Sequence, residues 1–188
     1  MTVKHARRRH LVVTKPIEVQ LVCGAGARIE PADHLEIDIE IDFEDTAIGK
    51  QNYHYRHGNG KFEAELAGAR TFCQIRDVEY MQNAGLALGG SLNNAVVVEN
   101  GAVLNEGGLR MENEFVRHKA LDCLGDLYLL GMQIRGKLTS FRPGHALSTK
   151  LVQALWRDTM AYQIIEDGVP MASSDGYALP EVAAAAAV

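Results

Sequence analysis

The most chemically suggestive residues of this chain are an imidazole and two carboxylates within the segment EFVRHKALDCLGDLYLLG at 114–131. His118, Asp122 and Asp126 recur every four residues, so on an α-helix they lie along one stripe. A histidine and a carboxylate one turn apart can bind the same divalent ion, and both are common ligands of zinc and iron. A catalytic zinc, however, generally has three protein ligands. The alternative is a solvated surface pair of His118 and Asp122.

A second candidate is His145, which follows Gly144 in the segment RPGHALS, where a helix is expected to begin. A histidine at this position is either a catalytic acid or base, or a residue that forms a hydrogen bond at the helix entrance; the residues alone favour the hydrogen-bonded role. The other five histidines have no ligand spacing, and no GxSxG, HExxH or Walker motif is present. By this reasoning the chain contains at most half of a metal site.

Composition excludes several classes of protein. The 188 residues are 47% hydrophobic and 23% charged, which is typical of a globular protein and argues against a disordered chain, a collagen-like repeat or a coiled coil. The net charge of −5 gives no general attraction to nucleic acids. The short basic run KHARRR at 4–9 is expected to be solvated. One domain is the simplest expectation for this length.

Cysteine usage and hydropathy predict the compartment. The three cysteines form no CxxC pair, and an odd number suits a reducing compartment better than a disulfide framework. The basic N-terminus is not followed by an apolar segment, and no stretch approaches the length of a membrane span. We therefore expect a cytoplasmic protein with no signal peptide and no stable membrane insertion.

Alternation of hydrophobic and polar residues predicts a sheet. In LEIDIEIDF at 35–43, hydrophobic residues alternate with acids, which is typical of an antiparallel strand with one face on a core. Further strands are predicted at 10–13, 17–22, 51–57, 95–98 and 133–141, and helices at about 61–67, 77–84, 114–130 and 144–158. The residues of the third helix predicted to face the core, before Gly131 ends it, are Val116, Ala120, Leu124, Leu127 and Leu130.

These elements indicate an α+β fold. We expect a two-layer sandwich in which a mostly antiparallel sheet is covered by two long helices, with a small strand-helix-strand insert at about 73–98. Residues 1–160 are expected to form a single domain. Residues 161–188 are expected to form a C-terminal extension, with a loose alanine-rich tail from about residue 170.

Four blocks of sequence, in the same order and spacing, resemble a known family. They are ARTF at 69–72, GLALGGSLNNAVVV at 85–98, VLNEGGLRMENEFVRHKALDCLGDLYLLG at 103–131 and GHAL at 144–147. Together they resemble the second, C-terminal domain of the UDP-3-O-acyl-N-acetylglucosamine deacetylases, the zinc amidases that catalyse the committed step of lipid A synthesis in Gram-negative bacteria. The resemblance extends from about residue 8 to about residue 158.

The resemblance implies a role for each candidate residue. His118 and Asp122 would be ligands of Zn²⁺, and Asp126 would orient His145. A protonated His145 would stabilise the oxyanion and help the amine to leave. A cation directed at a developing oxyanion lowers the barrier to acyl transfer by about 3 kcal/mol.

The resemblance also implies residues that contact the substrate. Thr71 would lie at the oxyanion, Phe72 beside the sugar and Lys119 near the nucleotide phosphate. The insert at about 73–98 resembles the family's hydrophobic passage for the fatty acyl chain. Three hydrophobic residues of the insert either line this passage or only fill a core: Val78, Met81 and Leu86.

The sequence departs from the family in several places. The family's enzymes have a first domain that contributes a third zinc ligand, a histidine, and a glutamate as general base, and neither is identifiable here. Asp33 and His34 are superficially similar to this motif, but they directly precede the strand predicted at 35–43. We therefore do not assign them the roles of the first-domain residues. Smaller departures, which alter local shape, are Cys73 where glycine is usual, and Pro143 and Ser148 beside GHAL.

Two functions remain open from the sequence. In the first, the chain is half of a metal-dependent amidase that hydrolyses the N-acetyl amide of UDP-3-O-(3-hydroxyacyl)-N-acetylglucosamine when a first domain, covalent or separate, completes the zinc site. The isolated chain would then be inactive or weakly active. In the second, the chain is a non-catalytic module that binds a UDP-sugar or an acyl chain. Either function predicts a UDP-sugar with a fatty acyl chain as the partner, and no nucleic acid.

Overall fold

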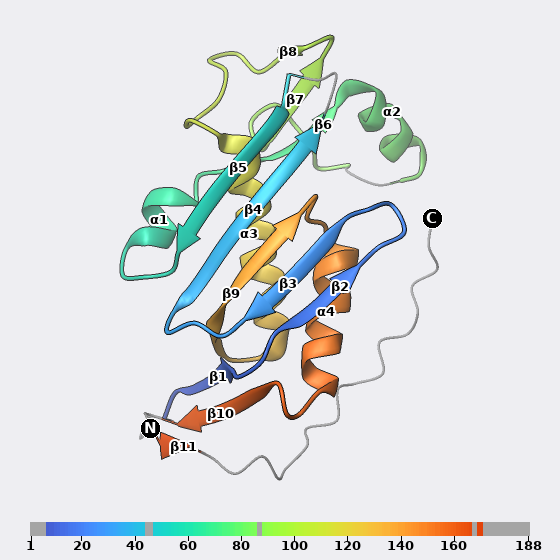
Figure 1. Ribbon diagram of the computed structural model, residues 1–188. Coiled ribbons are helices and arrows are strands. Elements are labelled where there is room, and N and C mark those ends of the chain that lie inside the picture. Colours follow the sequence, from blue (N-terminus) through green and yellow to red (C-terminus); the bar gives the residue numbers. More distant parts are fainter. Residues whose placement is uncertain (1–6, 44–46, 86–87, 167–168, 171–188) are drawn as a thin grey trace, which may run out of the picture.

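The computed structural model describes residues 7–43, 47–85, 88–166 and 169–170, and within these ranges the chain forms two sheets and a layer of helices (Figure 1). The tail predicted from about residue 170 therefore lies almost entirely outside the described residues. No helix in the described ranges is long and apolar enough to cross a bilayer. All three cysteines are free thiols.

The larger sheet has eight strands. In chain order they are β1 (Arg9–Val13), β2 (Ile17–Gln20), β3 (Gly26–Glu30), β4 (Leu35–Phe43), β5 (Gly49–Arg56), β9 (Gln133–Phe141), β10 (Tyr162–Glu166) and β11 (Val169–Pro170). The strand β9 pairs in parallel with β1 and β4 and antiparallel with β3. The other four pairings are antiparallel, so the predicted, mostly antiparallel sheet is confirmed.

The strand β4 shows why the two faces of this sheet differ. Its side chains Ile37, Ile39 and Ile41 are at most 3% exposed, and the acids between them point to the opposite face because successive side chains alternate. That opposite face carries partly exposed ion pairs between strands, such as Lys137 with Asp38 at 2.6 Å. The apolar face is left to be covered by another layer.

Two long helices cover the apolar face, α3 (Glu114–Leu127) and α4 (His145–Arg157) (Figure 1). The helix α3 packs against β4 and β5, α4 packs against β2 and β3, and the two helices contact each other. The residues predicted to face the core are all buried: Val116, Ala120, Leu124, Leu127 and Leu130. After α3 the chain continues into the 3₁₀ helix η1 (Tyr128–Leu130) and ends at Gly131, whose φ of 72° lies in the left-handed region that glycine tolerates.

A small second sheet lies at one end of the larger sheet (Figure 1). Its strands are β6 (Thr71–Gln74), β7 (Ala95–Glu99) and β8 (Ala102–Val103), and α2 (Ile75–Asn83) connects the first two. The strands β6 and β7 are parallel, as a crossover through a helix requires. The predicted strand-helix-strand insert is therefore present, and a short helix, α1 (Lys61–Glu65), precedes it.

A buried ion pair fixes this insert to α3. Arg70, directly before β6, is 8% exposed, and Glu114, the first residue of α3, is 0% exposed. The Glu114 carboxylate accepts hydrogen bonds from Nε (2.8 Å), Nη2 (3.0 Å) and the backbone N–H (3.0 Å) of Arg70, and from the backbone N–H of Arg110 (2.7 Å). Burial alone would raise the pKa of Glu114, but these hydrogen bonds and the Arg70 charge lower it below its usual range.

The substitution Glu114→Gln tests the contribution of this pair to stability. At pH 7 it should lower the free energy of unfolding by about 3–5 kcal/mol, because the Arg70 charge stays buried without its partner. Because the pKa of Glu114 is lower in the folded state, the wild-type advantage is present above the unfolded pKa of about 4.3. It is lost as the pH falls through the folded pKa. Urea unfolding of both proteins from pH 7 to pH 3 measures this convergence.

The matched control is Glu18→Gln, which removes the carboxylate of an exposed pair with Arg28 at 3.4 Å. This substitution should leave the stability unchanged within error, since exposed ion pairs contribute little. Equal effects of the two substitutions would contradict the role of the buried pair.

Candidate active site

The helix α3 places the predicted stripe of His118, Asp122 and Asp126 beside its buried face. Their side chains are 16%, 17% and 15% exposed, so they lie at the edge between the core and the solvent. The Nε2 atom of His118 is 3.4 Å from Oδ1 of Asp122. The structure thus brings the two residues together as the four-residue spacing predicts.

A backbone carbonyl fixes the other side of the His118 ring. The Nδ1 atom of His118 lies 3.2 Å from the carbonyl oxygen of Ala69, in the segment just before β6. A carbonyl oxygen can only accept, so this hydrogen bond requires a proton on Nδ1. In the neutral ring the lone pair then resides on Nε2, the atom that faces Asp122.

His118 and Asp122 have the chemistry of two zinc ligands. A metal-binding histidine almost always donates its second ring N–H to a carbonyl or carboxylate, which Ala69 provides here. Imidazole nitrogen and carboxylate oxygen both suit zinc. The second oxygen of Asp122 accepts a hydrogen bond from Nζ of Lys119 at 2.9 Å. Within the described ranges no group of three histidine, cysteine or acidic side chains gathers around a possible ion, so these residues fit part of a zinc site.

The second imidazole, His145, is the first residue of α4 and is paired with α3. Its Nδ1 lies 3.0 Å from both carboxylate oxygens of Asp126. The side chain of His145 is 70% exposed, whereas that of Asp126 is 15% exposed. A largely buried carboxylate therefore orients an exposed ring, with Nδ1 donating to Asp126 and Nε2 left for another partner, an arrangement also found in catalytic triads.

The strand β6 carries Thr71 and Phe72 to the same part of the molecule. The Phe72 ring makes edge-to-face contacts with the rings of Phe115 at 5.1 Å and Phe43 at 5.5 Å, and it lies 6.2 Å from the His118 ring. Thr71 is exposed and lines the pocket described next. Phe72 is thus the side chain that joins the histidine stripe to the insert.

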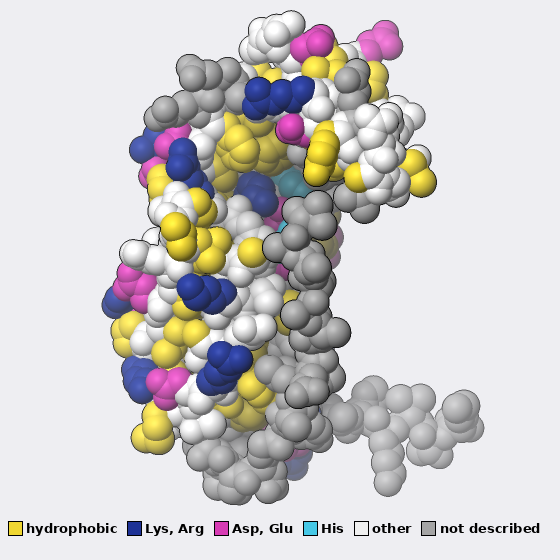
Figure 2. Space-filling model, turned by 90° about the vertical axis from the view of Figure 1, so that its right-hand side faces the viewer, with side chains coloured by type: hydrophobic (Ala, Val, Ile, Leu, Met, Phe, Trp, Pro, Cys, Tyr) yellow, Lys and Arg dark blue, Asp and Glu magenta, His cyan; other side chains and the backbone are white. Residues whose placement is uncertain are grey.

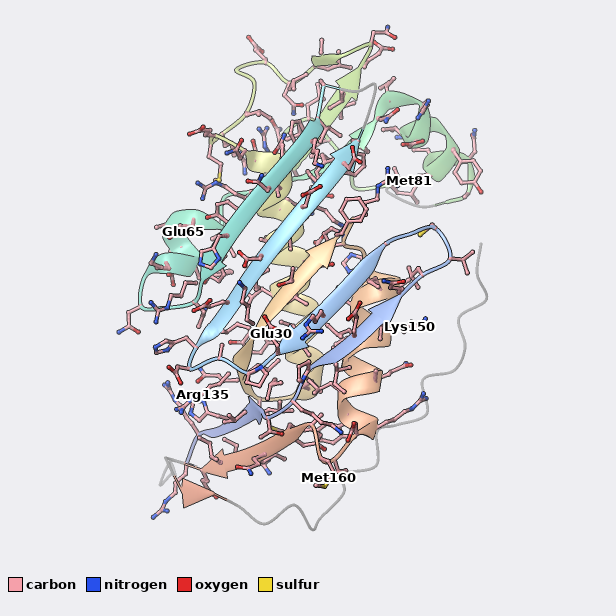
Figure 3. All side chains as sticks on the ribbon, in the orientation of Figure 1. Glu30, Glu65, Met81, Arg135, Lys150 and Met160 are labelled. Carbon is pink, nitrogen blue, oxygen red and sulfur yellow. The ribbon has the colours of Figure 1, made fainter. Side chains whose placement is uncertain are left out.

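An apolar pocket of about 960 Å³ opens between the insert and the end of β4. Figure 2 shows the face of the molecule that lies on the right-hand side in Figure 1. The pocket is the hollow in the upper part of this face, lined with hydrophobic side chains and with histidine at its lower edge. Met81, labelled in Figure 3, lies on α2, and its side chain lines the pocket. Leu86 lies outside the described residues. The lining includes Phe43, Thr71, Phe72, Val78, Met81 and Leu92.

Buried hydrogen bonds hold the wall of this pocket in place. Asn105 is 6% exposed, and its amide donates to the carbonyls of Leu92 and Ala95, both at 2.7 Å. Its side-chain oxygen accepts from the backbone N–H of Val97 at 2.9 Å. Asn105 is therefore bonded once to Leu92, in the segment before β7, and twice to β7 itself, and these bonds hold the pocket wall in place.

Cys73 also lines this pocket. Burial, with a further contribution from the Asp77 carboxylate, raises the pKa of its thiol. The thiol therefore stays protonated near neutral pH, and the side chain acts as a small apolar lining group.

Asp33 and His34 lie elsewhere. They line a separate hollow with Val12, Ala32 and Arg135, and none of these residues belongs to the stripe or lines the apolar pocket. Asp33 and His34 therefore line a different hollow from the other candidate residues.

The sequence reasoning missed the contribution of Ala69, Arg70 and Glu114. Arg70 and Glu114 both fall inside the blocks that carry the family resemblance, yet neither was assigned a role. The available signal was a glutamate directly before the apolar pair Phe115 and Val116, at the start of a helix. A charge in such a context needs a partner, but the sequence does not say which of the cations supplies it.

Comparison with known proteins identifies the family to which this chain is similar. A family model described as LpxC, UDP-3-O-acyl N-acetylglycosamine deacetylase, matches residues 1–157. A UDP-3-O-acyl-N-acetylglucosamine deacetylase of Anaeromyxobacter sp. (strain Fw109-5) is 42% identical over 182 residues, which are 95% of this chain and 60% of that protein.

Two further proteins with the same name are also similar to this chain. The one from Histophilus somni (strain 129Pt) is 38% identical over 94% of this chain and 58% of its own length. The one from Syntrophus aciditrophicus (strain SB) is 43% identical over 79% of this chain and 47% of its own length. The chain spans about half to three fifths of the length of these relatives. The chain belongs to the UDP-3-O-acyl N-acetylglycosamine deacetylase family.

Proposed function

We propose that this chain carries part of the active site of a zinc-dependent amidase in lipid A synthesis. The reaction is hydrolysis of the N-acetyl amide of UDP-3-O-(3-hydroxyacyl)-N-acetylglucosamine. The observation that supports it best is a set of two imidazole-carboxylate pairs, His118 with Asp122 within α3 and His145 of α4 with Asp126 of α3. Phe72, which lies beside His118, lines an apolar pocket. The substrate follows from the names of the relatives.

In this proposal His118, through Nε2, and Asp122, through its carboxylate, hold Zn²⁺. When bound, zinc acts as a Lewis acid that activates water and polarises the amide carbonyl. The chain's own contribution is to hold these two donors in fixed orientations. The Ala69 carbonyl keeps the His118 ring in place, and the short α-helical spacing keeps Asp122 beside it.

His145 acts on the other side of the reacting amide. As a cation oriented by Asp126, it stabilises the negative charge that develops on the amide oxygen, and it then donates a proton to the departing amine. Thr71 is an exposed hydroxyl at the start of β6, and in the proposal it donates a hydrogen bond to the same oxygen. Both groups act by being in position before the charge develops.

The substrate's other parts are bound by neighbouring groups. The apolar pocket, with Val78 and Met81 in its lining, takes the fatty acyl chain, since burial of hydrocarbon is favourable. Phe72, between the pocket and His118, contacts the sugar. The ammonium group of Lys119 is assigned to the nucleotide phosphate.

The proposal includes a first domain that supplies the remaining parts of the site, in the same chain or as a separate partner. These parts are a third ligand, a histidine, and a glutamate that serves as general base. The lengths of the relatives, of which this chain covers 47–60%, are consistent with such a domain. The proposed compartment is the cytoplasm, and free thiols at Cys23, Cys73 and Cys123 suit it.

The substitution His118→Ala tests the ligand assignment. Zinc binding to the 188-residue chain, measured by calorimetry, should be weak, and the substitution should weaken it further by more than about 10-fold because a ligand is lost. His54→Ala, on the opposite face of the sheet, is the control and should change nothing. Unchanged zinc affinity in His118→Ala would refute the assignment.

Activity measurements with the same proteins separate the two functions left open by the sequence. The 188-residue chain should release little or no acetate from UDP-3-O-acyl-N-acetylglucosamine. Fusion to the N-terminal part of the Anaeromyxobacter relative should produce activity that His118→Ala abolishes. Turnover by the unfused chain at the rate of the fusion would contradict the need for a first domain, and substrate binding that is independent of zinc, without activity in the fusion, would favour a binding module.

The substitution Asp126→Asn tests the orientation of His145. In the active fusion it should lower kcat about 10²–10³-fold, because the ring loses the charge that orients it. Zinc affinity should stay within about 2-fold of that of the unsubstituted fusion, because neither proposed ligand is altered. Lys150→Gln serves as the control: the Lys150 amine, labelled in Figure 3, donates to the Gln20 carbonyl at 2.7 Å. Equal kcat values for Asp126→Asn and the control would exclude the role of Asp126.

The substitution Val78→Trp tests the acyl pocket. A larger side chain at this position should fill part of the pocket and raise KM for the acylated substrate about 10-fold or more, with kcat nearly unchanged. Tyr80→Trp, also in α2 but 65% exposed, should leave KM unaltered. If Val78→Trp binds the acylated substrate as well as the wild-type protein does, the acyl chain lies elsewhere.

A further inference from the structure

A single peptide group, the one between Ala69 and Arg70, connects Glu114 to His118. Its carbonyl oxygen accepts a hydrogen bond from Nδ1 of His118 at 3.2 Å, and its N–H donates to Oε1 of Glu114 at 3.0 Å. Glu114 and His118 are four residues apart on α3, so they lie on one side of the helix, one turn from each other. The peptide group is therefore held at both of its polar ends by one helical turn.

The Glu114 end of this connection is rigid. The carboxylate is 0% exposed, and it accepts four hydrogen bonds, three from Arg70 and one from the backbone N–H of Arg110. Nη2 of Arg70 donates in addition to the carbonyl of Gly108 at 2.9 Å. A buried carboxylate whose two oxygens both accept hydrogen bonds has few alternative arrangements.

The planarity of the peptide group transmits this rigidity. The C=O and N–H bonds of a trans peptide lie in one plane and point in opposite directions. Once the Arg70 N–H is directed at Glu114, the Ala69 carbonyl is directed away from Glu114, toward His118. The carbonyl can only accept a hydrogen bond, and its 3.2 Å contact with Nδ1 is shorter than the 3.4 Å contact of Nε2 with Asp122, so it favours the form of the neutral His118 ring with its proton on Nδ1.

We propose that Glu114 and Arg70 are positioning residues for His118: through the Ala69–Arg70 peptide group they fix the proton on Nδ1 and turn the lone pair of Nε2 toward Asp122. Both side chains are buried, and their proposed effect reaches His118 through the peptide group. The hydrogen-bond chain and the choice of tautomer concern this chain's own atoms. The consequence for zinc affinity rests on the function proposed above.

The tautomer can be measured in the metal-free wild-type protein. Long-range ¹H–¹⁵N spectra distinguish a protonated from an unprotonated ring nitrogen, and a His118→Gln spectrum assigns the His118 signals. In spectra recorded for the neutral ring, we expect the proton on Nδ1. A proton on Nε2 in the wild-type protein would overturn the proposal without recourse to any further variant.

The substitution Glu114→Gln removes the charge that holds the peptide group. The His118 signals should shift toward the Nε2–H form that predominates for imidazoles free in water, and zinc should bind about 10–100-fold more weakly. Arg70→Lys keeps the charge but loses the bidentate contact with Glu114. It should therefore change the tautomer and the zinc affinity in the same direction as Glu114→Gln, but by less. A folded Glu114→Gln protein with the wild-type tautomer would refute the positioning role.

Two controls separate positioning from general destabilisation. Glu112→Gln makes the same chemical change at an exposed residue two positions earlier. Leu11→Ala removes a fully buried side chain in β1 and should cost about 2–5 kcal/mol of stability. Both should keep the wild-type tautomer, and a shift in Leu11→Ala as large as that in Glu114→Gln would refute the proposal. A tautomer that depends on Glu114 in a chain that binds no zinc would leave the positioning role intact and count against the proposed function alone.

Discussion

The buried contact between Arg70 and Glu114 is the interaction on which the arrangement of the candidate site depends. It joins the residue that enters the insert to the first residue of α3, two segments 44 positions apart. Removing two charges from water is costly, and an apolar pair of similar shape is often as stable. The ion pair differs from an apolar pair because hydrogen bonds are directional. Four hydrogen bonds to one carboxylate allow far fewer relative positions of the two segments than apolar contact does. The pair therefore fixes where Thr71 and Phe72 lie relative to His118.

The helix α3 serves two purposes, and its sequence separates them by face. One stripe, which includes Ala120, Leu124 and Leu127, is buried against the sheet. The stripe beside it carries His118, Asp122 and Asp126, each about one sixth exposed. At this border the side chains are shielded enough for their mutual attraction to exceed that in bulk water, yet open enough for a ligand to reach them. The core thus holds the reactive stripe rigid from one side only.

The parts that could be predicted from the sequence are those governed by local periodicity. Alternation over 35–43 and helical spacing over 114–130 gave the strand β4 and the helix α3 with the correct buried residues. The strand β3 was missed because its glycine-rich approach, CGAGAR at 23–28, looks like a loop. The strand β10 was missed because only its pairing with β1, far away in the chain, defines it.

The same limit applies to the site, where some partners lie one turn apart and others lie far apart in the chain. The approach of His118 to Asp122 is a local consequence of the helix and follows from spacing alone. The contact of His145 with Asp126 spans 19 positions, and that of His118 with Ala69 spans 49. No period in the sequence encodes them, because they depend on how α4 and the insert dock on α3. The family resemblance anticipated the first of these contacts and not the second.

Phe72 shows how the pocket and the histidine stripe become one site. Its ring packs against Phe115 of α3 and lies close to the His118 ring, and the same side chain lines the apolar pocket. A ligand that fills the pocket therefore ends beside His118 without any further adjustment of the chain. Since Phe72 is only two residues beyond the anchored Arg70, the buried ion pair sets the distance between the apolar pocket and the proposed zinc ligands. A pocket formed by an insert that was free to move could bind the acyl chain of the proposed substrate, but it could not hold the rest of that substrate at a fixed distance from His118 and Asp122.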